Sequence, residues 1–206
     1  MHPRLSRRGL YAITDGPRPD LLAAVKAALR GGAELLQYRD KTADSARRAF
    51  EARALRELCA RHGVPFVVND DVELALAAGA DGVHLGEDDG DVAAARARLG
   101  TEAIIGASCY DSPARARQLA AAGADYLAFG AFFPSPTKPN ARRATPDLLR
   151  AARPFGLPLV AIGGITPDNA PPLVDAGADF LAVISGVFAQ ADPEAAARRY
   201  AAMYTS

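Results

Sequence analysis

The chain has 206 residues, of which 24 are Lys or Arg and 24 are Asp or Glu, so its formal net charge at pH 7 is zero. This balance excludes the basic surface of a nucleic-acid or anionic-membrane binder, and a hydrophobic fraction of 50% excludes a disordered chain. The chain has no apolar run near the roughly 20 residues that span a bilayer, no signal-peptide pattern and only two cysteines, so we expect a cytoplasmic protein.

A short sequence of Gly, Ala and an acidic residue recurs at 32–34, 79–81, 123–125 and 177–179. Each copy ends a stretch rich in Ala and Leu and begins a short apolar run. Gly is typical of the residue that ends a helix, and a short apolar run is typical of a buried strand. The recurrence therefore indicates one structural unit of strand and helix that is used repeatedly.

The apolar runs predict eight strands, each followed by a helical stretch. In chain order they lie at 10–14, 35–36, 66–68, 82–85, 103–106, 126–129, 159–162 and 180–183. Helix starts are predicted at Asp44, Asp71, Ser112, Thr145 and Thr166. Eight such pairs in this length predict the α/β fold class and a (β/α)8 TIM barrel as one domain over 1–206, in preference to an open doubly wound sheet.

Active sites of such barrels lie at the carboxyl ends of the strands, so we take the polar residues there as candidates. The second strand runs into Gln37, Tyr38, Arg39, Asp40 and Lys41. If the strand alternation continues, Gln37, Arg39 and Lys41 lie on one side. An amide and two cations side by side predict an anion site.

Acidic residues follow the next two strands, with Asp70 and Asp71 after the third and Glu87, Asp88 and Asp89 after the fourth. Carboxylates beside an anion site predict a divalent cation such as Mg²⁺, which takes oxygen ligands and is often shared with a pyrophosphate. For Asp71 and Asp88 we favour helix capping or solvent exposure over a metal role.

The last four strands add further candidates. Ser108 closes the fifth strand, and a proline-rich loop after the sixth carries hydroxyls and a lysine that suit a phosphate. Loops after the seventh and eighth strands form the recurrent phosphate site of this fold. His84, inside the fourth strand, is expected to be structural. The candidates in the loops after the sixth, seventh and eighth strands are Ser135, Pro136, Thr137, Lys138, Gly164, Ile184 and Ser185.

The same residues form an ordered series of motifs. They are QxRxK (37–41), VND (68–70), HLGxxD (84–89), GxS (106–108), FPxxTK (133–138), GGI (163–165) and ISG (184–186). In this order they resemble the thiamine-phosphate synthase family, from Leu10 to about Tyr200. The resemblance implies an enzyme that joins hydroxymethylpyrimidine diphosphate to a thiazole phosphate, with a carboxylated thiazole phosphate also open, and releases pyrophosphate. It implies small phosphorylated substrates and leaves a homodimer open.

Carried over residue by residue, the resemblance implies three sites. The pyrimidine diphosphate would be held by Gln37, Tyr38, Arg39, Asp40, Lys41, Asn69, Ser108 and Lys138, of which Arg39, Lys41, Ser108 and Lys138 would be catalytic. The thiazole phosphate would be held by Ser135, Pro136, Thr137, Gly164, Ile184 and Ser185, and Mg²⁺ by Asp70 and Asp89. The sequence departs from the family pattern at Glu87, Ser135 and Cys109-Tyr110, the last pair standing where a His often follows the serine.

Two alternatives remain open at this stage. A thiazole tautomerase is a related barrel that moves protons and uses neither a diphosphate nor a metal. It is disfavoured because the cations and the two aspartates would have no purpose there, and because no His follows Ser108. A non-catalytic barrel that binds phosphate ligands would share the fold but release no pyrophosphate.

Overall fold

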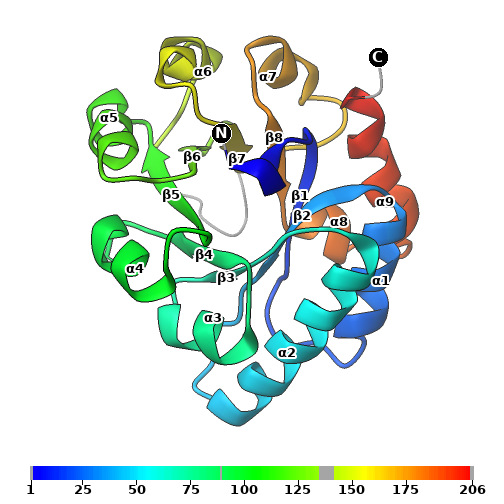
Figure 1. Cartoon of the computed structure of the whole chain (residues 1–206). Helices are drawn as coiled ribbons and strands as arrows, with labels where there is room; N and C mark the ends of the chain where they lie inside the picture. The colour runs from blue at the N-terminus through cyan, green and yellow to red at the C-terminus, as the bar shows by residue number, and fades with distance from the viewer. Residues whose placement is uncertain (1, 89, 135–141, 205–206) are drawn as a thin grey trace.

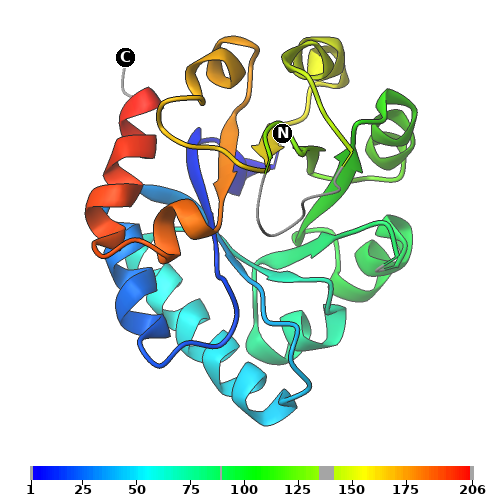
Figure 2. The ribbon, with the colours of Figure 1, turned by 180° about the vertical axis from the view of Figure 1, so that it is seen from behind.

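The computed structural model describes residues 2–88, 90–134 and 142–204. A closed barrel of eight parallel strands in chain order forms its centre, and the helices surround the strands (Figures 1 and 2). The strands are β1 (Gly9–Ile13), β2 (Ala33–Tyr38), β3 (Phe66–Asn69), β4 (Gly82–Leu85), β5 (Ile104–Tyr110), β6 (Tyr126–Gly130), β7 (Leu159–Ile162) and β8 (Phe180–Val183). This architecture confirms the predicted fold class.

The helices follow the strands along the chain. The α-helices are α1 (Leu21–Arg30), α2 (Ser45–His62), α3 (Val72–Ala78), α4 (Val92–Leu99), α5 (Pro113–Ala121), α6 (Pro146–Ala152), α7 (Pro171–Asp175), α8 (Ser185–Phe188) and α9 (Pro193–Ala201). Short 3-10 turns occur at η1 (Pro3–Leu5), η2 (Arg153–Phe155) and η3 (Ala202–Tyr204). In the part of the chain that these elements cover, no helix is long and apolar enough to cross a membrane.

Strand alternation divides the hydrophobic core into two clusters. Inward-facing side chains such as Leu35 and Val67 fill the barrel, whereas their neighbours Leu36 and Val68 pack against the surrounding helices. Leu5 of η1 belongs to the inner cluster and is only 2% exposed, and Figure 1 shows η1 across the ring of strands. The amino-terminal end of the barrel is therefore filled with apolar side chains.

The acidic residue of the repeated sequence has a structural role at that filled end. In three copies its carboxylate accepts a hydrogen bond from the backbone N–H at or near the start of the preceding odd-numbered strand. The pairs are Asp81 with Phe66 (2.9 Å), Asp125 with Ile105 (2.7 Å) and Asp179 with Leu159 (3.0 Å). Arginines from the surrounding segments pair with the same carboxylates, as Arg96 does with Asp125 at 2.6 Å. In these three copies the repeat thus ties β3, β5 and β7 each to the even-numbered strand that follows it.

Five strands, β1, β2, β3, β5 and β6, differ from their predicted ranges at one end or both, and one predicted helix start is misplaced. β5 runs on to Tyr110, because a register shift between Ser108 and Tyr110 lets the strand continue past its apolar part. The helix predicted to start at Thr166 is wrong, since α7 begins at Pro171. Thr166 instead opens a turn in which its N–H donates to the side-chain oxygen of Asn169 at 2.9 Å. The predicted caps Asp44, Asp71 and Ser112 are confirmed by hydrogen bonds to their helices.

Candidate active site

A cavity of about 680 Å³ opens at the carboxyl ends of the strands, opposite the filled end of the barrel. This volume is in the range of small-molecule sites. Nine of the predicted site residues line it: Gln37, Arg39, Lys41, Asn69, Asp70, Ser108, Gly164, Ile184 and Ser185. The barrel therefore brings together residues that lie up to about 150 positions apart in the sequence, as expected for this fold.

The floor of the cavity is a continuous chain of hydrogen bonds. The side-chain amide of Gln37 donates to the hydroxyl of Tyr11 at 2.5 Å, and the hydroxyls of Tyr11 and Tyr126 lie 2.7 Å apart. The Tyr126 hydroxyl lies 2.9 Å from Nδ1 of His84, whose Nε2 lies 2.9 Å from the Oγ of Ser108. Two predicted substrate residues on different strands are thus joined through three side chains of the barrel interior.

Packing holds this floor in place. The ring of Tyr126 stacks on His84 with centroids 5.6 Å apart and meets Tyr11 edge-on at 5.8 Å. Tyr126 fits only because Gly106 on the neighbouring strand has no side chain, since a Cβ there would overlap the Tyr126 ring. Burial raises the pKa of both Tyr11 and Tyr126, so both phenols stay protonated at neutral pH. The floor is a hydrogen-bonding surface without a phenolate.

Charged groups stand on one side of the cavity above the floor. Lys41 Nζ lies 3.4 Å from a carboxylate oxygen of Asp70, and the amide of Asn69 donates to the same oxygen. Asp70 has a φ of 64°, a backbone conformation that is uncommon outside glycine and concentrates at functional sites. Arg39 lines the cavity, and its guanidinium makes no hydrogen bond or ion pair with the described residues. It is therefore available to an anionic ligand.

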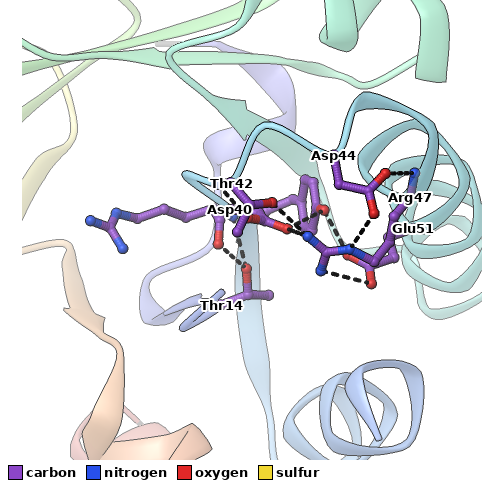
Figure 3. Close-up of polar contacts among 8 residues, drawn as sticks. Thr14, Asp40, Thr42, Asp44, Arg47 and Glu51 are labelled. Atoms are coloured by element: carbon purple, nitrogen blue, oxygen red, sulfur yellow. Dashed lines mark hydrogen bonds and ion pairs between the residues drawn. The ribbon is translucent and has the colours of Figure 1, made fainter. Parts of the chain in front are cut away.

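Tyr38 and Asp40, both predicted to bind the pyrimidine diphosphate, are not part of the described cavity wall. They lie on the other side of the β2 end and face α2, because neighbouring residues of an extended segment point in opposite directions (Figure 3). The Asp40 side chain is fully buried and pairs with Arg47 at 2.8 Å. Of this motif, Gln37, Arg39 and Lys41 line the cavity and stay the predicted substrate contacts.

Comparison with known proteins decides the family. The model of the thiamine monophosphate synthase family matches residues 10–187, which is most of the chain. The chain belongs to this family. It is 59% identical over 199 residues to a thiamine-phosphate synthase of Xanthomonas campestris pv. campestris, with 96% of each chain covered. It is 60% identical over 201 residues to a thiamine-phosphate synthase of Thioalkalivibrio sulfidiphilus, covering 96% of this chain and 95% of the relative.

A solved structure agrees with this assignment. Thiamine phosphate pyrophosphorylase from Pyrococcus furiosus has a TM-score of 0.88 and 35% sequence identity, covering 97% of this chain and 96% of that one. Membership of the thiamine monophosphate synthase family confirms the family, the function and the enzyme class that the motifs predict.

Some family motif residues lie outside the described residues. These are Asp89 and the loop residues Ser135, Pro136, Thr137 and Lys138. The two glycines after β7 line the cavity and also have a packing role. A side chain on Gly164 would overlap the backbone of Phe133 and Pro134, and Gly164 itself has a φ of 64°. Glycine at this position lets the segment after β6 pass close to the end of β7.

Sequence reasoning missed several cavity residues. His84 lines the cavity as well as packing in the barrel, and the signal that could have found it is its inward position two residues after Gly82. Arg142 also lines the cavity, stacks over the Tyr110 ring at 4.5 Å and pairs with Glu87 at 2.8 Å. No local pattern marks Arg142. The Cys109 side chain is buried between the barrel and the surrounding helices. Burial raises the pKa of this thiol to about 12, so it is unreactive.

Proposed function

We propose that this chain catalyses thiamine phosphate synthesis in this cavity, with the pyrimidine diphosphate bound along β2 and β3 and the thiazole phosphate bound at the ends of β7 and β8. The observation that carries the proposal is that Arg39, Lys41 and Asp70 line the same cavity as the hydrogen-bonding floor, with Lys41 and Asp70 3.4 Å apart. The cations complement the negative charge of a diphosphate, and the floor offers hydrogen bonds to a flat aminopyrimidine. One cavity offers both.

The chemistry requires the bond between the pyrimidine methylene carbon and the diphosphate oxygen to break. The bonding electron pair leaves with the diphosphate, and the positive charge that remains is delocalised over the aminopyrimidine. Arg39 and Lys41 would stabilise the negative charge as it develops on the leaving group, with Lys138 as a third expected cation. Such preorganised charge is usually the largest single contribution to catalysis.

The new bond forms between the pyrimidine methylene carbon and the ring nitrogen of the thiazole. The nitrogen donates its lone pair to this carbon, so the positive charge passes to the thiazole ring, which becomes a thiazolium. No protein nucleophile is needed. Ser108 and Gln37, at the two ends of the floor, would orient the pyrimidine by hydrogen bonds. Ser185 and the backbone at Gly164 and Ile184 would hold the thiazole phosphate, which places the two reactants together.

We propose Mg²⁺ as the metal of this reaction. Asp70 offers a carboxylate in the cavity beside the amide group of Asn69, and Asp89 is the second expected ligand. Residues 2–88, 90–134 and 142–204 contain no group of three or more Asp, Glu, His or Cys side chains that could hold a metal ion by themselves. Oxygen donors in small number suit Mg²⁺, which commonly takes one or two carboxylates together with substrate phosphates. When bound, the ion would help to neutralise the departing pyrophosphate.

The tautomerase alternative needs one adjustment. The His84 imidazole lies beside Ser108, so the lack of a His directly after Ser108 no longer argues against that reaction. The cations Arg39 and Lys41 still do, because a tautomerase substrate carries no diphosphate for them. We also propose that the protein acts in the cytoplasm, which is supported by the two buried free thiols of Cys59 and Cys109. We further propose a homodimer, which light scattering would test.

The test is product formation by the purified chain. Incubation with the pyrimidine diphosphate, the thiazole phosphate and Mg²⁺ should give thiamine monophosphate, measured by chromatography and mass spectrometry. A tautomerase would convert the thiazole phosphate alone, and a binding protein would leave both compounds unchanged. Either of those results would reject the proposed reaction.

A further inference from the structure

A cluster of polar side chains lies behind the cation-bearing end of β2. We call Tyr38, Asp40, Thr42, Arg47 and Glu51 the β2–α2 anchor. The Arg47 guanidinium lies 2.8 Å from Asp40, donates to the Thr42 hydroxyl at 2.5 Å and lies 3.7 Å from Glu51 (Figure 3). Arg47 therefore connects the segment after β2 to the first turns of α2.

The start of α2 places Arg47 for this role. The side chain of Asp44 accepts the backbone N–H of Arg47 at 3.0 Å, so the helix begins at Ser45 and Arg47 stands in its first turn. Glu51, one turn later, accepts the hydroxyl proton of Tyr38 at 2.6 Å. Residues four apart lie on the same face of a helix, so both Arg47 and Glu51 face the β2 end.

The anchor holds the residues on both sides of Arg39. Tyr38 precedes it and is 1% exposed, while the Asp40 side chain follows it and is fully buried. Asp40 also accepts the backbone N–H of Thr42 at 2.8 Å, which fixes the turn after Lys41. From the other side, the Thr14 hydroxyl accepts the N–H of Arg39 at 2.8 Å and donates to its carbonyl oxygen at 3.1 Å.

The Arg39 guanidinium itself has no polar partner among the described residues. Its position in the cavity therefore depends on its backbone, and its backbone is fixed by the anchor and by Thr14. Lys41 depends on the same segment, because its side chain is 62% exposed and has one ion pair among the described contacts, with Asp70. A shift of Asp40 would move both cations together.

We propose that Arg47, acting through Asp40, is a positioning residue that sets the place of Arg39 and Lys41 for binding a diphosphate. This inference deepens the proposed function and rests on it. In this role Asp40 does not touch the substrate. Its buried carboxylate connects the segment that carries Arg39 and Lys41 to α2. The hydrogen bond from Thr42 and the charge of Arg47 outweigh burial and lower the pKa of Asp40, so the pair is ionised at neutral pH.

The chain contains a matched control pair. Arg96 on α4 pairs with Asp125 at 2.6 Å, and Asp125 accepts a backbone N–H from β5, as Asp40 does from Thr42. The exposed fractions of the two arginine side chains are 23% for Arg96 and 28% for Arg47. Arg96 lies at the filled end of the barrel, so its loss costs stability without moving a cavity residue.

The experiment compares Arg47→Ala with Arg96→Ala, and the isosteric Asp40→Asn with Asp125→Asn. For each folded variant, calorimetry measures the affinity for inorganic pyrophosphate, and steady-state kinetics measures KM for each substrate and kcat. We expect Arg47→Ala to weaken pyrophosphate binding and to lower kcat/KM for the pyrimidine diphosphate by about 10- to 100-fold, as misplaced groups do. KM for the thiazole phosphate should stay unchanged.

Both Arg96→Ala and Asp125→Asn should keep the wild-type values for both substrates. If the variants of the Arg47 pair change these values no more than the control pair does, the positioning role is rejected. Should Arg47→Ala fail to fold, Asp40→Asn gives the same decision, because it removes one charge and keeps the shape. A wild-type protein that releases no pyrophosphate would reject the proposed function itself, which separates the two failures.

Discussion

Lys41 Nζ and a carboxylate oxygen of Asp70 lie 3.4 Å apart across the ends of β2 and β3. The first group is proposed for the diphosphate and the second for Mg²⁺, so the cation and the carboxylate neutralise each other in the cavity until ligands bind. A magnesium diphosphate complex would separate them and pair each with an opposite charge. Under the proposed roles, the contact would link metal binding to diphosphate binding at one point of the site.

Replacing Arg39 by Ala should lower kcat by about 100-fold or more, because one preorganised donor to the leaving group is lost. The fold should be retained, since the Arg39 side chain has no polar partner among the described residues. Single-turnover kinetics with saturating substrates checks this, with circular dichroism as the control for folding. A variant with near-normal turnover would remove Arg39 from the proposed chemistry.

The Asp70→Asn substitution removes the negative charge but keeps the size of the side chain. We expect the Mg²⁺ concentration needed for half-maximal activity to rise by about 10-fold or more, in line with the loss of one charged ligand from a site of few ligands. A Mg²⁺ titration of activity measures it. An unchanged titration curve would show that Asp70 is not a ligand.

Gly106 should not tolerate even a methyl group. A Cβ at this position would overlap the ring of Tyr126, so Gly106→Ala must push Tyr126 away from His84 and Tyr11. The free energy of unfolding should fall by about 1 to 3 kcal/mol, as for other overpacked cores. Urea denaturation gives this value, and wild-type stability would contradict the described packing of the floor.

Stability should depend on the charge of Asp40 in a defined pH range. The pKa of Asp40 is lowered in the folded protein, so its contribution is present above the pKa of the unfolded state, about 3.9, and is lost as pH falls through the lower folded pKa. The difference in unfolding free energy between wild type and Asp40→Asn should be constant near neutral pH and shrink below about pH 4. Denaturant unfolding across this range tests it, and a difference that grows on acidification would contradict the ion pair.

Most of the fold was predictable because it follows from local patterns. The strands 82–85, 159–162 and 180–183 match the prediction at both ends, and each is preceded by a proline or by the acidic residue of the repeat. The predicted range of β5 was too short, because the end of the strand, Ser108 to Tyr110, does not continue the apolar run. The start of α7 was misplaced because Thr166 and Pro167 carry the same signal as a helix start but form a turn.

The candidate site was predictable where one strand carries the signal. Alternation along β2 identified Gln37, Arg39 and Lys41, and the same rule should have set Tyr38 and Asp40 apart from them. The other contacts depend on the closed barrel. His84 meets Ser108 only because β4 and β5 are neighbours, and Arg47 meets Asp40 only through the packing of α2 against the β2 end. No local sequence pattern contains such pairings.

The most direct test of this account is pyrophosphate release by the purified protein, measured with both substrates and Mg²⁺ and again with each of the three omitted in turn. We predict release only when the pyrimidine diphosphate, the thiazole phosphate and Mg²⁺ are all present, with thiamine monophosphate formed in equal amount. Binding of the ligands without pyrophosphate release under any of these conditions would contradict the proposed reaction at this cavity.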